Sequence, residues 1–183
     1  DHAPNAGLSR IVWPRSSADP ASFQLCVAMP VVASLTGWLQ RVLERDAPEL
    51  PPRSITKLVG LGPGLTPSGD DFLVGMLVVL SLVGRFDLVA AVDQVIHPTL
   101  AEDTGPISRL HLAAALSGET GEQLHAMVNA VLVGDHNVLA SRLVSISHVG
   151  HSSGWDTLAG AVMVLRVLAR AHRSVMAVGR DAG

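Results

Sequence analysis

The chain has few of the residues that mark several common protein classes. Its single cysteine, Cys26, excludes an intramolecular disulfide and a multi-cysteine metal site, and suits a reducing cytoplasm. Aromatic residues make up only 3% of the chain, which has no tyrosine. Its longest apolar run, 72–84, is shorter than the roughly 20 residues that span a bilayer. We therefore expect a cytoplasmic protein that has no membrane partner.

Charged residues are also scarce, at 16% of the 183 residues, and the net charge is −3. Without a cluster of lysine and arginine there is no electrostatic surface for nucleic acid, so we expect no nucleic-acid partner. Apolar residues reach 48%, enough to bury a sizeable core in one domain or two small ones. The chain begins at Asp1, which is not a natural start, and shows no signal-peptide pattern, so we interpret it as a processed or shortened chain.

The pattern of apolar residues predicts a mainly α-helical protein with a small N-terminal α/β portion. We assign residues 1–50 to that portion and 51–183 to a helical domain, because the prolines of 46–53 end any helix there. In the first portion, two β-compatible runs, 8–13 and 23–29, flank the polar segment 14–20. A helical period of apolar residues follows at 31–45. A short strand is predicted at 55–61. The helices expected beyond it are 70–84, 86–97, 106–117, 120–133, 135–147 and 153–172.

The most constrained segment is GLGPGLTPSGDD, residues 60–71, in which glycines and prolines lead into a helix. Its end is repeated later in the chain, because Ser68–Gly75 and Ser153–Gly160 share the pattern S-G-x-D-x-L-x-G. Two helix starts built alike predict a pseudo-symmetric bundle in which both N-termini face one cavity. Gly75 and Gly160 are then expected where the two helices cross closely.

Two interpretations of these motifs remain open. In the structural one, Ser68 and Ser153 are N-caps that place Asp71 and Asp156 at the third helical position, an acidic form of the capping box. Asp70 has no part in it, because Trp155 replaces it in the second copy. In the functional one, free amides and the helix dipole attract an anion.

The carboxylates beside those amides would repel a bare anion. They favour either Mg²⁺ between carboxylates and phosphate, or a ligand that carries an amide or amine next to its anionic group. The loop is not a Walker-type phosphate loop, because no lysine follows its glycines, and it lacks the G-x-G-x-x-G spacing of dinucleotide-binding proteins.

Residues outside the glycine loop carry weaker signals. His148 and His151 flank the second motif and suit a general acid or base, or are loop histidines bonded to backbone. Arg109 is a candidate partner for phosphate or carboxylate, or a solvated arginine. The other histidines, His111 included, have no motif context.

The segments GLGPGLTPSGDDFLVG and GHSSGWDTLAG, with a T-x-x-x-S segment at Thr104–Ser108 between them, resemble the AllH-type family. This family, formerly a domain of unknown function, includes a subunit of the oxamate carbamoyltransferase of bacterial allantoin degradation, a branch of purine catabolism. The resemblance covers roughly residues 55–170. It implies a cytoplasmic protein that acts with partner subunits, or as a homo-oligomer, in moving a carbamoyl group between oxalurate, carbamoyl phosphate and oxamate.

Carbamoyl transfer requires positioning and donors aimed at a developing oxyanion, not a covalent nucleophile. On this interpretation the catalytic candidates are Asp70, Asp71 and His151, and the two aspartates hold Mg²⁺ if the metal takes part. The substrate-binding candidates are Gly62, Gly64, Thr66, Ser68, Gly69, Arg109, Ser152, Ser153 and Asp156. The alternative is a non-catalytic helical module that binds a ligand or assembles with a partner carrying the catalytic residues.

Overall fold

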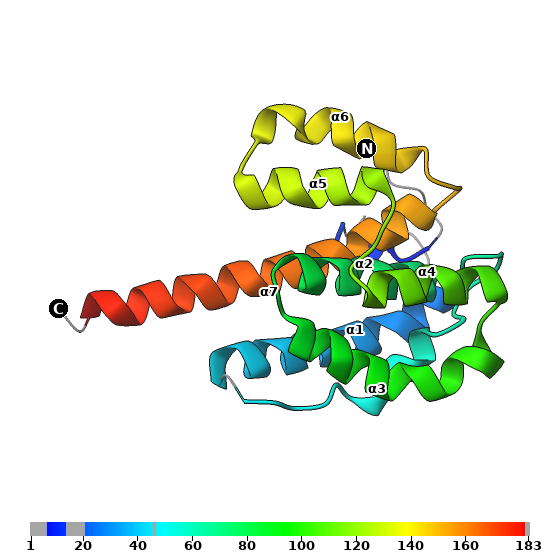
Figure 1. The fold of residues 1–183 in the computed structure, drawn as a ribbon, viewed down its shortest axis with the longest axis horizontal. Coiled ribbons are helices and arrows are strands. Elements are labelled where there is room, and N and C mark those ends of the chain that lie inside the picture. The colour runs from blue at the N-terminus through cyan, green and yellow to red at the C-terminus, as the bar shows by residue number, and fades with distance from the viewer. Residues whose placement is uncertain (1–6, 14–20, 46, 182–183) are drawn as a thin grey trace.

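The computed structural model describes residues 7–13, 21–45 and 47–181, and side chains as far as residue 173. The described chain is helical (Figure 1). Its α-helices are α1 (Phe23–Arg45), α2 (Ser68–Leu82), α3 (Phe86–Asp103), α4 (Pro106–Leu116), α5 (Glu122–Val133), α6 (His136–Ser147) and α7 (Ser153–Asp181), with short 3₁₀ helices η1 (Ser9–Ile11) and η2 (Arg53–Leu58). The mainly α prediction is confirmed.

The strands predicted from the sequence are wrong, because the described residues contain none. Residues 8–13 hold η1, and most of 55–61 lies in η2. Residues 23–29 begin α1 instead, and the predicted polar segment 14–20 lies outside the described residues. Burial explains α1, since Leu25, Ala28 and Leu35 are buried at helical spacing and form one packed face.

Helix α3 also differs from its predicted end, because it continues through Pro98 to Asp103. A proline inside a helix removes the bond to the carbonyl four residues earlier, here that of Gln94. Gln94, His97 and Pro98 are all exposed, so water can satisfy that carbonyl and the helix continues.

Helix α2 is the centre of the molecule and packs most extensively against α7. The pair α5 and α6 lies on one side of α7, and α1 and α3 lie on the other (Figure 1). A Cβ atom at Gly75 would come within 1.8 Å of the Thr157 carbonyl oxygen, and one at Gly160 within 1.9 Å of the Phe72 carbonyl oxygen. The backbones of α2 and α7 therefore touch at these two glycines, which confirms the predicted crossing.

By length and composition alone, α1 is long and apolar enough to cross a membrane, a test that the core helix of a soluble protein also passes. Its window is 44% buried. Trp38 and Leu39 of α1 lie in the same core cluster as Phe72 of α2 and Val164 of α7, so one face of α1 is part of the common core.

Candidate functional site

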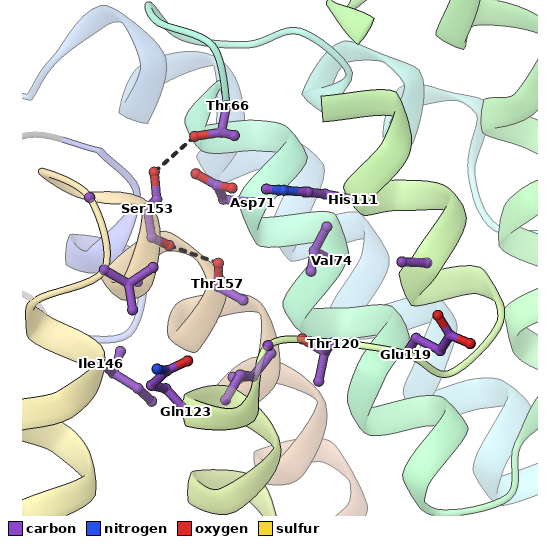
Figure 2. Close-up of a pocket in the computed structure, with 16 residues that line it drawn as sticks. Thr66, Asp71, Val74, His111, Glu119, Thr120, Gln123, Ile146, Ser153 and Thr157 are labelled. Atoms are coloured by element: carbon purple, nitrogen blue, oxygen red, sulfur yellow. Dashed lines mark hydrogen bonds between the residues drawn. The ribbon is translucent and has the colours of Figure 1, made fainter. Parts of the chain in front are cut away.

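The N-termini of α2 and α7 lie side by side. The hydroxyl oxygens of Thr66, just before α2, and Ser153, the first residue of α7, are 2.9 Å apart and hydrogen-bonded (Figure 2). The prediction that the two S-G-x-D starts meet at one cavity is confirmed in that Thr66, Asp71, Ser153 and Gly154 line the same pocket.

This pocket has a volume of about 490 Å³. Its walls come from α2, α4, the loop into α5, the start of α5, the end of α6 and the start of α7. The lining residues are Thr66, Asp71, Val74, His111, Ala114, Glu119, Thr120, Gly121, Gln123, Leu124, Ile146, Val149, Gly150, Ser153, Gly154 and Thr157. Among these described residues there is no lysine or arginine, so any positive character comes from His111 and from backbone amides.

Asp71 is the most perturbed group of the pocket. The residue is only 5% exposed, and its Oδ2 has no hydrogen-bond partner in the described part of the chain. Burial raises the pKa of Asp71 to about 7, against the smaller opposing effect of the Ser153 hydroxyl. Figure 2 shows the carboxyl group between Ser153 and His111. A carboxyl group that titrates near neutral pH beside a cavity is a candidate binding or proton-transfer group.

The equivalent carboxyl group of the second copy, Asp156, is fully buried and is not part of the pocket lining. The backbone N–H of Leu8 donates a hydrogen bond to Asp156 Oδ1 at 2.5 Å. Burial raises the pKa of Asp156, and the Leu8 N–H and the hydroxyls of Ser68 and Ser152 oppose that shift. Asp156 therefore anchors the N-terminal segment 7–13 to α7.

The serine hydroxyl of each motif acts on the aspartate of the other motif. Ser68 acts on Asp156, whereas Ser153 acts on Asp71. Pro67 is the N-cap of α2, and no side chain makes a capping bond there, so the predicted capping box of Ser68 and Asp71 is wrong. Each serine supports the carboxyl group of the other helix, which joins the two N-termini.

Asp70 is fully buried and does not line the pocket. Its Oδ1 accepts the Gly60 N–H at 2.9 Å, and its Oδ2 accepts the hydroxyls of Ser108, at 2.6 Å, and Thr104. These bonds tie the glycine loop and the start of α4 to α2. Both oxygens are engaged with protein donors, and the described residues contain no group of three or more His, Cys, Asp or Glu side chains for a metal. This donor set does not fit the Mg²⁺ site that two carboxylates suggested.

Several predicted residues lie away from the pocket lining. Arg109 donates to the Ala101 carbonyl at 3.1 Å, and His151 is exposed on the loop before α7. The loop glycines have other uses, since Gly62 and Gly64 adopt positive φ and the Cα of Gly69 packs against the Leu58 carbonyl. The residues of this group are Gly62, Gly64, Ser68, Gly69, Asp70, Arg109, His151, Ser152 and Asp156. Of the predicted set, Thr66, Asp71 and Ser153 line the pocket.

Sequence reasoning missed the far wall of the pocket, which includes His111, Glu119, Thr120 and Gln123. These residues come from α4, from the loop between α4 and α5 and from the start of α5, and they belong to no motif. The signal that was present is the N-terminus of α5, where Gly121 is the N-cap and no side chain makes a capping bond. Its first amides are thus left for water or for a ligand.

A protein-family model described as the oxamate carbamoyltransferase subunit AllH matches residues 58–165. The matched region is more than half of the chain and contains every residue that lines the pocket. No solved structure matches the chain.

Proposed function

The chain belongs to the family of the oxamate carbamoyltransferase subunit AllH, and we propose that it holds the carbamoyl-bearing metabolite of such an enzyme in the pocket between α2 and α7. The family is defined by a subunit, which implies partner subunits. The ligands that we propose are oxamate, oxalurate and carbamoyl phosphate. Each joins an amide or carbamoyl group to an anionic group.

The observation that carries this proposal is Asp71, a buried carboxyl group with an unpartnered oxygen at the wall of a pocket. Buried polar atoms in proteins nearly always have a partner. Asp156 Oδ2 and Ser81 Oγ also have none in the described chain, but of the three residues Asp71 alone lines the pocket, where a ligand can supply the partner. The pocket volume of about 490 Å³ lies in the usual range of small-molecule sites.

The rest of the pocket suits the anionic end of such a ligand. Thr120 and Gln123 lie on the opposite side of the pocket from Thr66 (Figure 2). There the N-terminus of α5 has no side-chain cap, and the positive end of its helix dipole favours a carboxylate, against the opposing charges of Glu119 and Glu122. His111 lines the same pocket and adds positive charge when it is protonated. A ligand of a few atoms would thus have its amide near Asp71 and its carboxylate toward α5.

The pocket lining has no lysine or arginine in the described chain, which favours a variant of this proposal. Phosphoryl groups are usually held by such cations or by metal ions. On this variant the subunit binds the carbamoyl half of the reaction, and a partner subunit supplies the groups that hold phosphate. Asp71 then positions the carbamoyl group, and its pKa of about 7 allows it to exchange a proton at neutral pH.

A ligand screen with a blocked pocket tests the proposal. Oxamate, oxalurate and carbamoyl phosphate, each with and without Mg²⁺, should raise the melting temperature of the wild-type chain. Val74→Trp fills the pocket from α2 and should abolish the shift, whereas Val133→Trp, at a position 68% exposed, should keep it. The proposal fails if no ligand shifts the wild type, or if Val74→Trp responds as the wild type does.

A further inference from the structure

The two helix starts are related as pseudo-symmetric copies in their backbone contacts. In the crossing, Gly75 packs on the Thr157 carbonyl and Gly160 on the Phe72 carbonyl, and these are equivalent positions of the two copies. The segments before the helices match as well. The Cα of Gly69 packs on the Leu58 carbonyl, as that of Gly154 packs on the Ile146 carbonyl.

The amides of these two glycines are bonded in the same way. Gly69 donates to the Leu61 carbonyl at 2.9 Å, and Gly154 donates to the Val149 carbonyl at 3.0 Å. Asp71 and Asp156 therefore have equivalent backbone settings. What one carboxyl group binds is a guide to what the other can bind.

The two carboxyl groups have similar burial and similar hydroxyl donors from the protein. Each is buried, each keeps an unpartnered Oδ2 in the described chain, and each is supported by a serine hydroxyl of the other helix. A second hydroxyl completes each set, from Thr66 at Asp71 and from Ser152 at Asp156.

The copies differ in the donor that faces the carboxyl group. At Asp156 the donors are backbone N–H groups, that of Leu8, 2.5 Å from Oδ1, and that of Ser9. Space for that peptide is provided by Gly7, where a Cβ atom would come within 2.3 Å of the same oxygen. At Asp71 no backbone N–H is bonded to the carboxyl group by the described chain, and the pocket is there instead.

We propose that Asp71 accepts a hydrogen bond from the N–H of a neutral amide or carbamoyl group of the ligand, as Asp156 accepts one from the Leu8 peptide. A primary amide and a peptide offer the same donor, a planar N–H whose nitrogen does not accept. A ligand with a methyl group at this place leaves the buried carboxyl group without a donor. The inference rests on the proposed function only in taking the pocket as the ligand site.

Matched ligand pairs test this inference. Pyruvate has the shape and charge of oxamate with CH₃ in place of NH₂, and acetyl phosphate is related to carbamoyl phosphate in the same way. In titration calorimetry with the wild-type chain, each methyl analogue should bind at least about tenfold more weakly than its amide, since a buried acceptor is left unpaired. Asp71→Ala should reduce the difference to about twofold or less, whereas Asp93→Ala, which changes a partly exposed carboxyl group on α3 outside the pocket lining, should preserve it.

The pH dependence of oxamate binding gives an independent readout. The ionised carboxyl group is the stronger acceptor, so affinity should rise from pH 5.5 to 8.5 and level off above the pKa of about 7. The titratable groups that face Asp71 or line its pocket are Asp70, Asp156, His111 and Glu119. His111 is the side chain among them that can carry positive charge, so the profile is measured again in His111→Gln. Affinity that rises toward low pH in both proteins would mean that Asp71 donates, and would overturn the inference.

The outcomes separate this inference from the proposed function. Equal binding of amides and methyl analogues overturns the inference and leaves the function standing. If none of the metabolites binds, the proposed function fails, and the inference is decided by the Asp71 ¹³Cγ signal, which acetamide should shift and acetone should not. No shift with acetamide overturns it. Tighter binding of acetyl-Gly-Leu-Ser-amide than of any small amide also overturns it, because the pocket would then receive a partner's backbone.

Discussion

The two S-G-x-D copies have the same backbone setting and opposite outcomes at their carboxyl groups. Asp156 is covered by residues 7–13, whose Leu8 N–H reaches Oδ1 at 2.5 Å. Asp71 borders a pocket of about 490 Å³ instead, although both carboxyl groups keep an unpartnered Oδ2 in the described chain. The helix start is therefore a scaffold common to both copies. What lies next to it decides whether the carboxyl group is structural or available to a ligand.

The residues just before these two aspartates, Asp70 and Trp155, also differ between the copies in the contacts that they make. Asp70 bonds to Thr104 and Ser108 and so holds α4 against α2. Trp155 takes the equivalent place and packs edge-on against Trp13, with ring centroids 5.6 Å apart. Both residues attach a neighbouring segment to the shared pair, one through hydrogen bonds and the other through apolar contact.

The largest expected effect tests the symmetry of the crossing itself. A methyl group at Gly75 or at Gly160 would overlap a backbone carbonyl of the other helix, at 1.8 or 1.9 Å. Neither backbone can move without displacing the core, so Gly75→Ala and Gly160→Ala should each cost about 3 kcal/mol or more in the free energy of unfolding. Urea denaturation followed by circular dichroism measures it.

Gly37→Ala is the matched control, because this helical glycine in α1 has only the end of the Arg41 side chain nearby, at 3.6 Å. It should leave stability unchanged or raise it by up to about 1 kcal/mol. Tolerance of alanine at one crossing glycine and not at the other would break the pseudo-symmetric description.

The next effect compares the carboxyl groups through pH. The pKa of Asp71 rises from 3.8 to about 7 on folding, so the folded state holds its proton more tightly than the unfolded state. The free energy of unfolding should therefore fall as pH rises from about 4 to about 7, and stay lowered above that. At roughly 1.4 kcal/mol per pKa unit, the penalty is at most about 4 kcal/mol.

Asp71→Asn cannot ionise and should gain stability over the wild type at pH 8 but not at pH 4, as measured by denaturation at both values. Asp156→Asn should gain less, because its charged form also accepts the Leu8 N–H. Parallel stability profiles for wild type and Asp71→Asn would contradict the raised pKa of Asp71.

Much of the helical part was predictable, because glycines and prolines mark where its helices end. The prediction of 106–117 differs from α4, Pro106–Leu116, by one residue. The helices of the N-terminal portion could not be predicted from the sequence, because a run of apolar residues such as 23–29 fits a strand or a buried helix equally well. Only packing against α2 and α7 decides between them, and those contacts come from distant parts of the chain.

The site was half predictable for a related reason. The repeat identified the two helix N-termini. The residues next to each serine in the sequence suggest that it caps its own helix, whereas in the folded chain each serine hydroxyl acts on the aspartate of the other helix. The sequence pattern also does not show which of Asp70 and Asp71 faces the pocket. Consecutive helical residues point about 100° apart, so one turns toward α4 and the other toward the pocket. The T-x-x-x-S segment, with Thr104 just before α4 and Ser108 within it, was the available signal for the partners of Asp70.

The smallest expected effect separates the covered copy from the open one. Gly7 has φ +80° and its Cβ position lies 2.3 Å from Asp156 Oδ1, so Gly7→Ala should loosen residues 7–13 at a cost of about 1–2 kcal/mol. Gly134→Ala, at φ +73° with no atom within 4 Å, has the backbone strain alone and should cost less. Amide exchange at Leu8 should become faster in Gly7→Ala and stay unchanged in Gly134→Ala.

Oxamate binding should remain within about twofold of wild type in both, because only the Asp71 copy is open to ligand. A marked loss of binding in Gly7→Ala would mean that the covered carboxyl group controls the open one through the exchanged serines.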